Sequence, residues 1–179
     1  MIPTGYARVA DTLLIHGSQA SRMLRALEEG IELCLTVTLV DGLVLARSAF
    51  HHSMNYRSVM AIGRTRPVLD PEEKEAALRA LVEHIVPGRS AEVRGGDRRE
   101  LAKTAVLAVP LDEVSAKVRS GPPIDDEPDY ALPIWAGVLP LRQVADAPVP
   151  DPRLDQALAP PSHVVSWRRP AGDPARVRS

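Results

Sequence analysis

The sharpest change in the pattern of apolar and polar residues lies within residues 11–30. An apolar run at residues 13–15, typical of a strand, stops at His16, Gly17 and Ser18. Apolar residues then recur with helical spacing at Ala20, Met23, Leu24 and Leu27. The pattern predicts a strand that turns into a helix, with Ser18 as the N-cap and Gly30 at the C-terminal end.

The next segment predicts an antiparallel meander. Residues 33–39 alternate between apolar and polar positions, as in a half-buried strand. The Asp41-Gly42 pair that follows indicates a two-residue hairpin turn, with residues 43–48 as the return strand. A polar loop at residues 50–55 then leads to another alternating run over residues 56–68.

Two helix starts follow, each with an aspartate cap and a glutamate three residues later. Asp70 precedes Pro71 and predicts a helix to about Val86. Asp97 predicts a shorter helix to about Lys103. Both glutamates complete the pattern of a capping box.

The remaining apolar runs predict strands at residues 105–111, 114–118 and 134–139, and residues 1–9 are predicted to be the end of another strand. Short strands with helices between them predict a mainly β fold: a small closed antiparallel barrel with α+β decorations. We expect one domain over residues 1–145. The Pro-rich residues 146–179 are predicted to be an extended or partly disordered arm.

Composition narrows the classes of function. The 22 basic and 23 acidic residues give no basic excess, so nucleic acid is not the expected partner. No apolar run reaches the ~18 residues of a membrane span, and the lone Cys34 excludes an internal disulfide. We therefore expect a cytoplasmic protein with a small-molecule ligand and no membrane partner.

Few motifs point to chemistry. No His-x-x-x-His, Cys-x-x-Cys, Gly-x-Ser-x-Gly, Walker or Rossmann pattern is present, so no metal site is predicted and His51-His52 is interpreted as a loop pair. The start of the first helix is different. Unpaired backbone N–H groups there favour an anion, and Ser21 and Arg22 add a hydroxyl and a charge suited to a phosphate. An ordinary capped helix with a solvated arginine fits the same residues.

Two other sequence features fit either a structural or a ligand-binding role. The polar cluster Tyr56-Arg57-Ser58 lies in a predicted strand, and Trp135 stands alone in an apolar one. Filling of the core is the ordinary role of such a tryptophan.

Longer motifs carry a resemblance to a known family. They are Ile-Pro-Thr-Gly-Tyr (residues 2–6), Leu-Ile-His-Gly-Ser-Gln-Ala-Ser-Arg (14–22), Ala-Arg-Ser-Ala-Phe-His-His-Ser-Met-Asn-Tyr-Arg-Ser-Val (46–59), Lys-Val-Arg-Ser-Gly-Pro (117–122) and Trp-Ala-Gly-Val-Leu-Pro (135–140). Over residues 1–154 the sequence resembles the pyridoxamine 5′-phosphate oxidase-like flavoproteins, in particular the flavin-nucleotide-binding branch related to nitroimidazole-resistance proteins. This resemblance implies a split β-barrel homodimer that binds FMN in two symmetric clefts at the subunit interface.

The resemblance also implies roles for individual residues. Ser21 and Arg22 fall where the oxidases hold the FMN phosphate, His16 falls near that phosphate, and Ser58 is offered by the neighbouring subunit. The backbone of residues 2–4 lines the flavin ring edge, and Trp135 lines the cleft wall. The candidate cofactor-binding residues are Ile2, Pro3, Thr4, His16, Gly17, Ser18, Ser21, Arg22, Tyr56, Arg57, Ser58 and Trp135.

Two departures from the family pattern shape the expected function. The oxidases carry Arg-Lys where this chain has Ser21-Arg22, and their vitamin-recognition residues are not identifiable, so oxidation of vitamin B6 is not expected. Relatives also carry residues before Ile2 that form the first barrel strands, which this chain is expected to lack. We expect an FMN-dependent reductase or oxidase of a small organic molecule. The alternatives are a non-catalytic flavin- or haem-binding stress protein, an interaction scaffold, and F420 in place of FMN.

Overall fold

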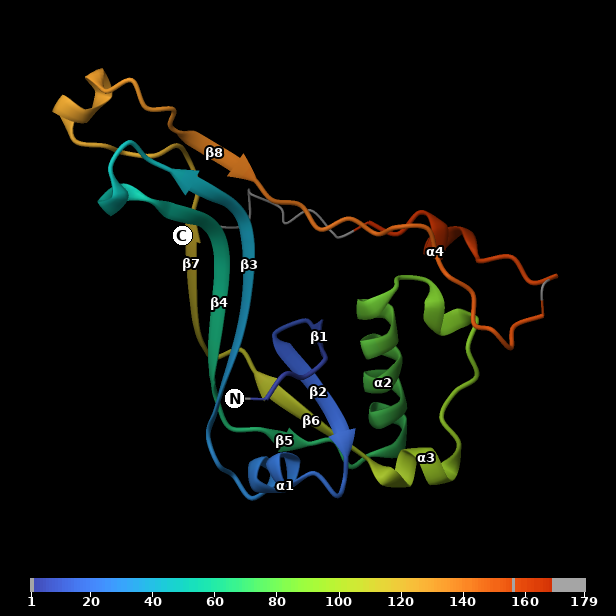
Figure 1. The fold of residues 1–179 in the computed structure, drawn as a ribbon. Helices are drawn as coiled ribbons and strands as arrows, with labels where there is room; N and C mark the ends of the chain where they lie inside the picture. The colour runs from blue at the N-terminus through green and yellow to red at the C-terminus, as the bar shows by residue number, and fades with distance from the viewer. Residues whose placement is uncertain (1, 156, 169–179) are drawn as a thin grey trace.

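The computed structural model describes residues 2–155 and 157–168. The strands are β1 Tyr6–Val9, β2 Thr12–Ser18, β3 Leu33–Leu45, β4 Ser53–Gly63, β5 Arg66–Pro67, β6 Thr104–Pro110, β7 Glu113–Arg119 and β8 Gly137–Pro140. The helices are α1 Arg22–Glu28, α2 Pro71–Ile85, α3 Arg98–Lys103 and α4 Ser162–Val165, with short 3-10 turns η1 Ala49–His51, η2 Arg89–Ala91 and η3 Glu127–Ala131. The strands form two antiparallel four-stranded sheets, in the orders β1-β2-β6-β5 and β7-β4-β3-β8 (Figure 1).

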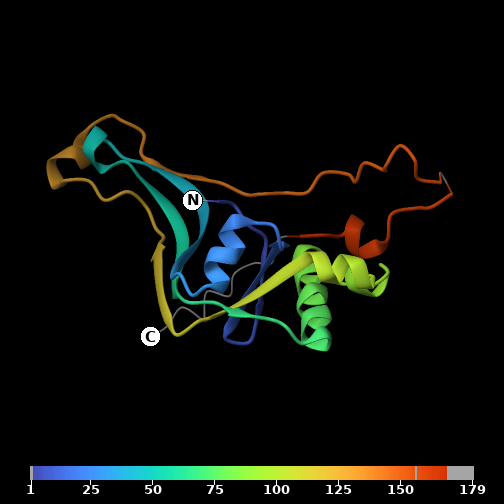
Figure 2. The ribbon, with the colours of Figure 1, turned by 90° about the horizontal axis from the view of Figure 1, so that it is seen from below.

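The core surrounds β6, whose residues 105–109 are all buried. On one face of the first sheet, Val106 and Ala108 pack with Ala77 of α2. On the other face, Leu107 packs with Leu24 of α1 and with Leu33 at the start of β3 (Figure 2). Because both faces are covered, β6 is a continuous apolar run rather than an alternating one.

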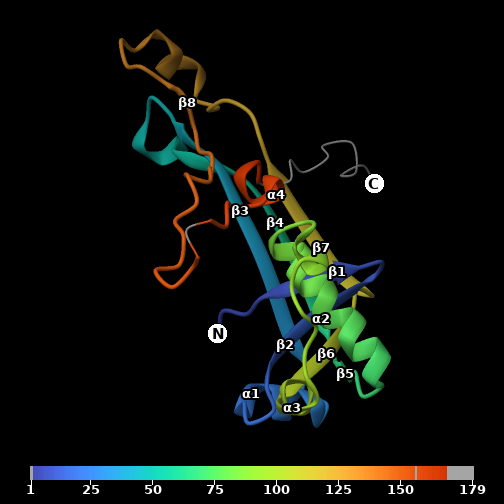
Figure 3. The same ribbon diagram turned by 90° about the vertical axis from the view of Figure 1, so that its right-hand side faces the viewer.

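The second sheet extends well beyond this core. Figure 3 shows β3 and β4 as a long hairpin that leaves the first sheet near α1 and carries β8 close to its tip. Ala61 lies at the end of the hairpin next to the first sheet, where it is buried against Leu13 and Val109. Farther along the same face, Val59 and Val118 are 41% and 45% exposed, so this apolar face continues past the core without cover from the described residues.

The predicted helices α2 and α3 are confirmed, together with their caps. Asp70 accepts a hydrogen bond from the Glu73 N–H, and Asp97 and Glu100 form a complete capping box. The capping box expected at Asp70 is only half formed, because the Glu73 carboxylate instead binds the Arg66 guanidinium. The strands predicted at residues 105–111 and 114–118 are confirmed as β6 and β7.

The hairpin turn predicted at Asp41-Gly42 is wrong. β3 runs through both residues, with a bulge in its pairing to β4 between Val40 and Gly42, and the chain reverses only around η1. Turns of the expected type need positive φ angles, which Gly42 does not have. Gly42 instead permits close approach of β8, since a Cβ there would lie 3.0 Å from Val138 Cγ1 and 3.1 Å from the Leu139 carbonyl oxygen.

Three other predicted boundaries are also corrected. The first helix is capped by Ser21 rather than Ser18, which is the last residue of β2. Residues 2–4 precede β1 and lie in no strand. Trp135 lies before β8, which begins only at Gly137.

Beyond β8 the chain runs in an extended path from the hairpin tip to α4 (Figure 1), with residues 141–150 all exposed. It then meets the end of α2, where the Trp167 indole N–H donates to the Ile85 carbonyl at 3.1 Å. Residues 156 and 169–179 of the expected arm lie outside the described residues. Within the described ranges, no helix has the length and apolar character needed to cross a bilayer.

Candidate functional site

The turn from β2 into α1 carries the first group of expected site residues. Ser18 Oγ accepts from the Ala20 N–H at 3.1 Å, and Ser21 Oγ accepts from the Leu24 N–H at 3.4 Å. Each hydroxyl therefore acts as a local cap while keeping its own O–H as a donor. Arg22 is exposed at the first position of α1, and no described residue offers it a hydrogen bond or an ion pair. Within the described part of the chain, its guanidinium is therefore free to bind a ligand.

The residues just before this turn have different roles. A Cβ on Gly17 would lie 2.9 Å from Leu24 Cδ1, so this glycine lets α1 pack closely on β2. His16 is exposed, and its ring lies beside Gly5 in the segment that precedes β1. The structure thus brings residues 2–5 to the same end of the first sheet as His16, although the expected strand there is absent.

The second expected group, Tyr56-Arg57-Ser58, is split between the two faces of β4. Tyr56 and Ser58 lie on the face with Val40 and Thr38, and the Thr38 and Ser58 hydroxyl oxygens are 2.8 Å apart. This face has a shallow groove of about 200 Å³, whose lining residues are Thr38, Val40, Met54, Tyr56 and Ser58. Lys117, exposed on β7 opposite Ser58, adds a cation to the same face.

Arg57 lies on the opposite face and does not belong to this groove. Its guanidinium donates two hydrogen bonds of 2.8 Å to the carboxylate of Asp41. The hydrogen bond to Asp41 raises the pKa of Arg57, so this pair is a firm structural contact rather than a free ligand-binding charge.

The two groups are far apart along the hairpin. β3 and β4 meet α1 at the end where Leu33 pairs with Gly63, and Ser58 lies five residues up β4 from Gly63. At the usual rise of a strand this is about 17 Å. One copy of the chain does not bring Ser58 to Arg22.

Trp135 does not fill the core. It is 70% exposed beside the start of β8, near the tip of the hairpin. Its ring lies close over Gly137, where a Cβ would meet the indole at 3.0 Å. An exposed tryptophan at this place is available to a ligand or a partner surface.

The hairpin tip contains a buried ion pair that the sequence analysis missed. The Asp125 side chain is fully buried and accepts from the Arg47 backbone N–H and guanidinium, both at 2.9 Å. Burial raises the pKa of Asp125, but the hydrogen bonds from Arg47 and Ser48 outweigh it and the net shift is downward. The Arg47 guanidinium also lies 4.9 Å from the centre of the Tyr130 ring. The partners are 78 residues apart, and no local pattern signals their contact.

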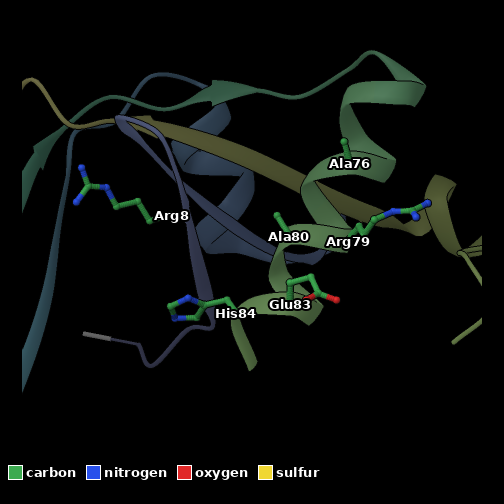
Figure 4. Close-up of a pocket in the computed structure, with 6 residues that line it drawn as sticks. All are labelled: Arg8, Ala76, Arg79, Ala80, Glu83 and His84. Carbon is green, nitrogen blue, oxygen red and sulfur yellow. The ribbon is translucent and has the colours of Figure 1, made fainter. Parts of the chain in front are cut away.

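A larger open groove of about 470 Å³ lies between β1 and α2, lined by Arg8, Ala76, Arg79, Ala80, Glu83 and His84 (Figure 4). Arg8 and Arg79 point away from each other, and their charges pair with Asp11 and Glu75. Glu83 accepts from two backbone N–H groups of the following loop. The polar groups of this groove therefore do not converge on a ligand. The described residues also contain no group of three or more His, Cys, Asp or Glu side chains placed to hold a metal ion.

Two antiparallel sheets, a long hairpin and helices packed on the first sheet define the protein as a split β-barrel, as the sequence resemblance implied. The family model for pyridoxamine 5′-phosphate oxidase matches residues 1–118, and the chain belongs to this family. A comparison with curated proteins gives no match.

Two solved structures are similar to this chain over more than nine tenths of its length, which is more than the family model covers. The flavocytochrome Anf3 from Azotobacter vinelandii is 43% identical with a TM-score of 0.87, over 93% of this chain and 78% of that one. An FAD and haem binding protein from Mycobacterium smegmatis is 41% identical with a TM-score of 0.87, over 91% and 80%. A protein from Bacteroides thetaiotaomicron that is described as a 5-nitroimidazole antibiotic resistance protein is 23% identical with a TM-score of 0.53. The match covers 64% of this chain and 66% of that one, and the two share the fold.

Proposed function

We propose that this protein binds a flavin nucleotide and uses it as an oxidoreductase on a small organic molecule. The observation that carries the proposal is the likeness over more than nine tenths of the chain to two proteins described as a flavocytochrome and an FAD and haem binding protein. A flavin supplies two-electron chemistry when bound. The chain's own side chains then bind it, orient it and exclude water.

The phosphate of the flavin nucleotide is assigned to Ser21 and Arg22. Arg22 has no ionic partner among the described residues, and charge-assisted hydrogen bonds to phosphate are among the strongest that a protein makes. The Ser18 and Ser21 hydroxyls add donors, and His16 lies on the neighbouring strand end. Since α1 has only seven residues, we assign the main attraction to the Arg22 charge rather than to the helix dipole.

A second copy of the chain completes the site in this proposal. Ser58 and Tyr56 lie about 17 Å or more up the hairpin from α1, so they reach a flavin at Arg22 only from a partner subunit. The exposed apolar residues Val59 and Val118 support a homodimer, because large apolar surfaces on a sheet face are normally covered. The cofactor then lies between the two subunits.

The cofactor is proposed to be FMN. The same phosphate site would accept FAD, which the relative from Mycobacterium smegmatis is described as binding, and F420 is the third possibility to test. Absorbance of the purified protein, followed by mass analysis of the ligand released on denaturation, separates the three. A colourless protein that takes up none of them on incubation would contradict the proposal.

A non-catalytic protein that holds haem as well as flavin is the second candidate, and the description of the Mycobacterium smegmatis relative favours it. Reduction of the flavin by NADPH or NADH, with a generic electron acceptor, separates the two. An oxidoreductase turns over repeatedly. A storage or stress protein binds both cofactors and leaves the acceptor unchanged.

A further inference from the structure

The cations near α3 differ in whether a carboxylate neutralises them. Four arginines from β5 to the start of α3 each form an ion pair with a glutamate: Arg66 with Glu73, Arg79 with Glu75, Arg89 with Glu92 and Arg94 with Glu100. Arg98, Arg99 and Lys103 of α3 are exposed, and no described residue forms a hydrogen bond or ion pair with their side chains. This helix therefore carries positive charge that the described part of the chain leaves uncompensated.

Arg99 and Lys103 lie on the same face of α3. Residues four apart are neighbours on a helix surface, and Leu101, midway between them in the sequence, lies on the opposite, partly buried face. Two like charges at this spacing repel each other and destabilise a helix. An anion bound between the two side chains removes this repulsion.

The end of α3 is joined to the turn that carries the proposed flavin phosphate site. The Gln19 N–H donates to the Lys103 carbonyl at 2.9 Å, and Ser18 pairs with Thr104 where β2 and β6 meet. Arg22 follows Gln19 by three residues, and Figures 1 and 3 both show α1 and α3 at the same end of the first sheet. Lys103 therefore adds an unpaired cation close to a turn that already has one in Arg22.

An arginine and a lysine on one helix face suit a phosphate monoester. Such a group carries a charge of about −1.5 to −2 at pH 7. Arginine binds it through two parallel hydrogen bonds, and lysine binds it as a point charge. The 2′-phosphate of NADPH is a monoester, whereas each phosphate inside a dinucleotide linkage, as in FAD, has one ionisable oxygen fewer. In other dinucleotide-binding folds an arginine near the ribose accommodates this 2′-phosphate.

We propose that Arg99 and Lys103 bind the 2′-phosphate of a nicotinamide dinucleotide that serves as electron donor to the proposed flavin. This rests on the proposed oxidoreductase function and names the class of its donor, the phosphorylated dinucleotide. Both side chains form charge-assisted hydrogen bonds to the phosphate, and no covalent bond is made or broken at either of them. The 2′-phosphate is the group by which NADPH differs from NADH, so these two residues determine which of the two donors binds.

The test is a calorimetric titration of the full-length protein, in the presence of excess FMN, with three adenine nucleotides. Adenosine 2′,5′-bisphosphate carries the 2′-phosphate of NADPH. Adenosine 5′-diphosphate has as many phosphates, linked to each other as in FAD, and adenosine 5′-monophosphate is the reference. We expect the wild type to bind the 2′,5′-bisphosphate at least about tenfold more tightly than either of the others, and Arg99→Ala and Lys103→Ala to lose most of this difference.

The matched control is Arg98→Ala, which removes a charge from the same helix outside the face of Arg99 and Lys103. It should bind all three nucleotides as the wild type does. In kinetics of flavin reduction, Lys103→Ala should raise the KM for NADPH about tenfold and leave the KM for NADH unchanged. The Asp97 cap accepts backbone N–H groups that all these variants keep, so equal melting temperatures are expected. Arg99→Gln or Lys103→Gln replaces an alanine variant that melts lower.

The outcomes separate this inference from the proposed function. If the 5′-diphosphate binds as tightly as the 2′,5′-bisphosphate and weakens in the same variants, the two cations hold the second phosphate of FAD and the inference is wrong. Equal affinities of the wild type for all three nucleotides, or an equal loss in Arg98→Ala, also overturn it and leave α3 an ordinary charged surface. A protein that takes up no flavin, yet prefers the 2′,5′-bisphosphate through Arg99 and Lys103, keeps this phosphate site and contradicts the proposed function.

Discussion

Arg22 is the residue on which the proposed phosphate site depends most. The variant Arg22→Ala should weaken FMN binding by about 1.5–3 kcal/mol, the range for a hydrogen bond to a charged group. Binding of riboflavin, which has no phosphate, should hardly change. Fluorescence titrations with both ligands measure the two affinities.

The control is Arg25→Ala, on the next turn of the same helix, α1. Its guanidinium donates to the Ala20 carbonyl at 3.2 Å, so this variant removes a charge from α1 and leaves Arg22 in place. If Arg22→Ala and Arg25→Ala bind FMN equally well, the phosphate lies elsewhere and α1 is an ordinary capped helix.

The pairing between strands β3 and β8 requires a glycine at position 42. A Cβ at this position would press on Val138 and on the backbone of Leu139, so Gly42→Ala should cost about 1–3 kcal/mol of the free energy of unfolding. At Gly63, the other end of the hairpin, an added Cβ would meet no described atom within 4 Å. Gly63→Ala should change stability by less than about 1 kcal/mol.

Urea denaturation of the two variants measures the difference, and hydrogen exchange of the β8 amides locates it. Faster exchange confined to residues 137–140 in Gly42→Ala is the expected pattern. Equal stability of the two variants would show that β8 moves aside without cost.

The α3 capping box should give stability that depends on pH. Hydrogen bonds from Arg94 lower the pKa of Glu100 from 4.5 to about 2. A lowered pKa in the folded state stabilises the fold above the ordinary pKa, and this contribution is lost as the pH falls from about 4.5 to about 2. The contact is exposed, so the effect should be small and weakened by salt.

Melting temperatures of wild type and Glu100→Gln from about pH 6 to about pH 2 test this. The wild type should melt higher at the upper end of this range, by at most a few degrees, and the two should converge at the lower end. A difference that stays constant throughout would show that the charge of Glu100 does not contribute.

For the whole molecule, the proposed shared site links cofactor binding to assembly. A ligand that binds only the dimer must stabilise it by mass action. Val59→Arg, which places a charge on the exposed apolar face, should shift the protein toward monomer and weaken flavin binding at least about tenfold. Leu69→Arg, at an 80% exposed position outside the sheets, is the control.

Sedimentation velocity with and without FMN measures both effects. The wild type should show more dimer with FMN, and Leu69→Arg should behave as the wild type. A protein that stays monomeric and still binds FMN tightly would rule out the shared site.

Features that depend only on neighbouring residues can be predicted from local patterns in the amino-acid sequence. The aspartate caps of α2 and α3 are local hydrogen bonds between residues three apart, and the apolar run at residues 105–111 predicts the strand β6. That both faces of this strand are covered is seen only in the fold. The glycine-serine turn before α1 was also located, within a few residues of the true cap at Ser21. The distinctive motifs identified the family, which the match over residues 1–118 confirms.

Contacts between residues that are far apart in the chain follow from the fold and not from local patterns. The local pattern at Asp41-Gly42 favoured a turn, but pairing with β4 and β8 and the ion pair to Arg57 keep β3 extended through it. The cluster Tyr56-Arg57-Ser58 is continuous in sequence, yet the alternation of a strand sends Arg57 to the opposite face. Asp125 and Arg47 meet across 78 residues because burial of one charge requires the other, and such a contact leaves no trace in local periodicity.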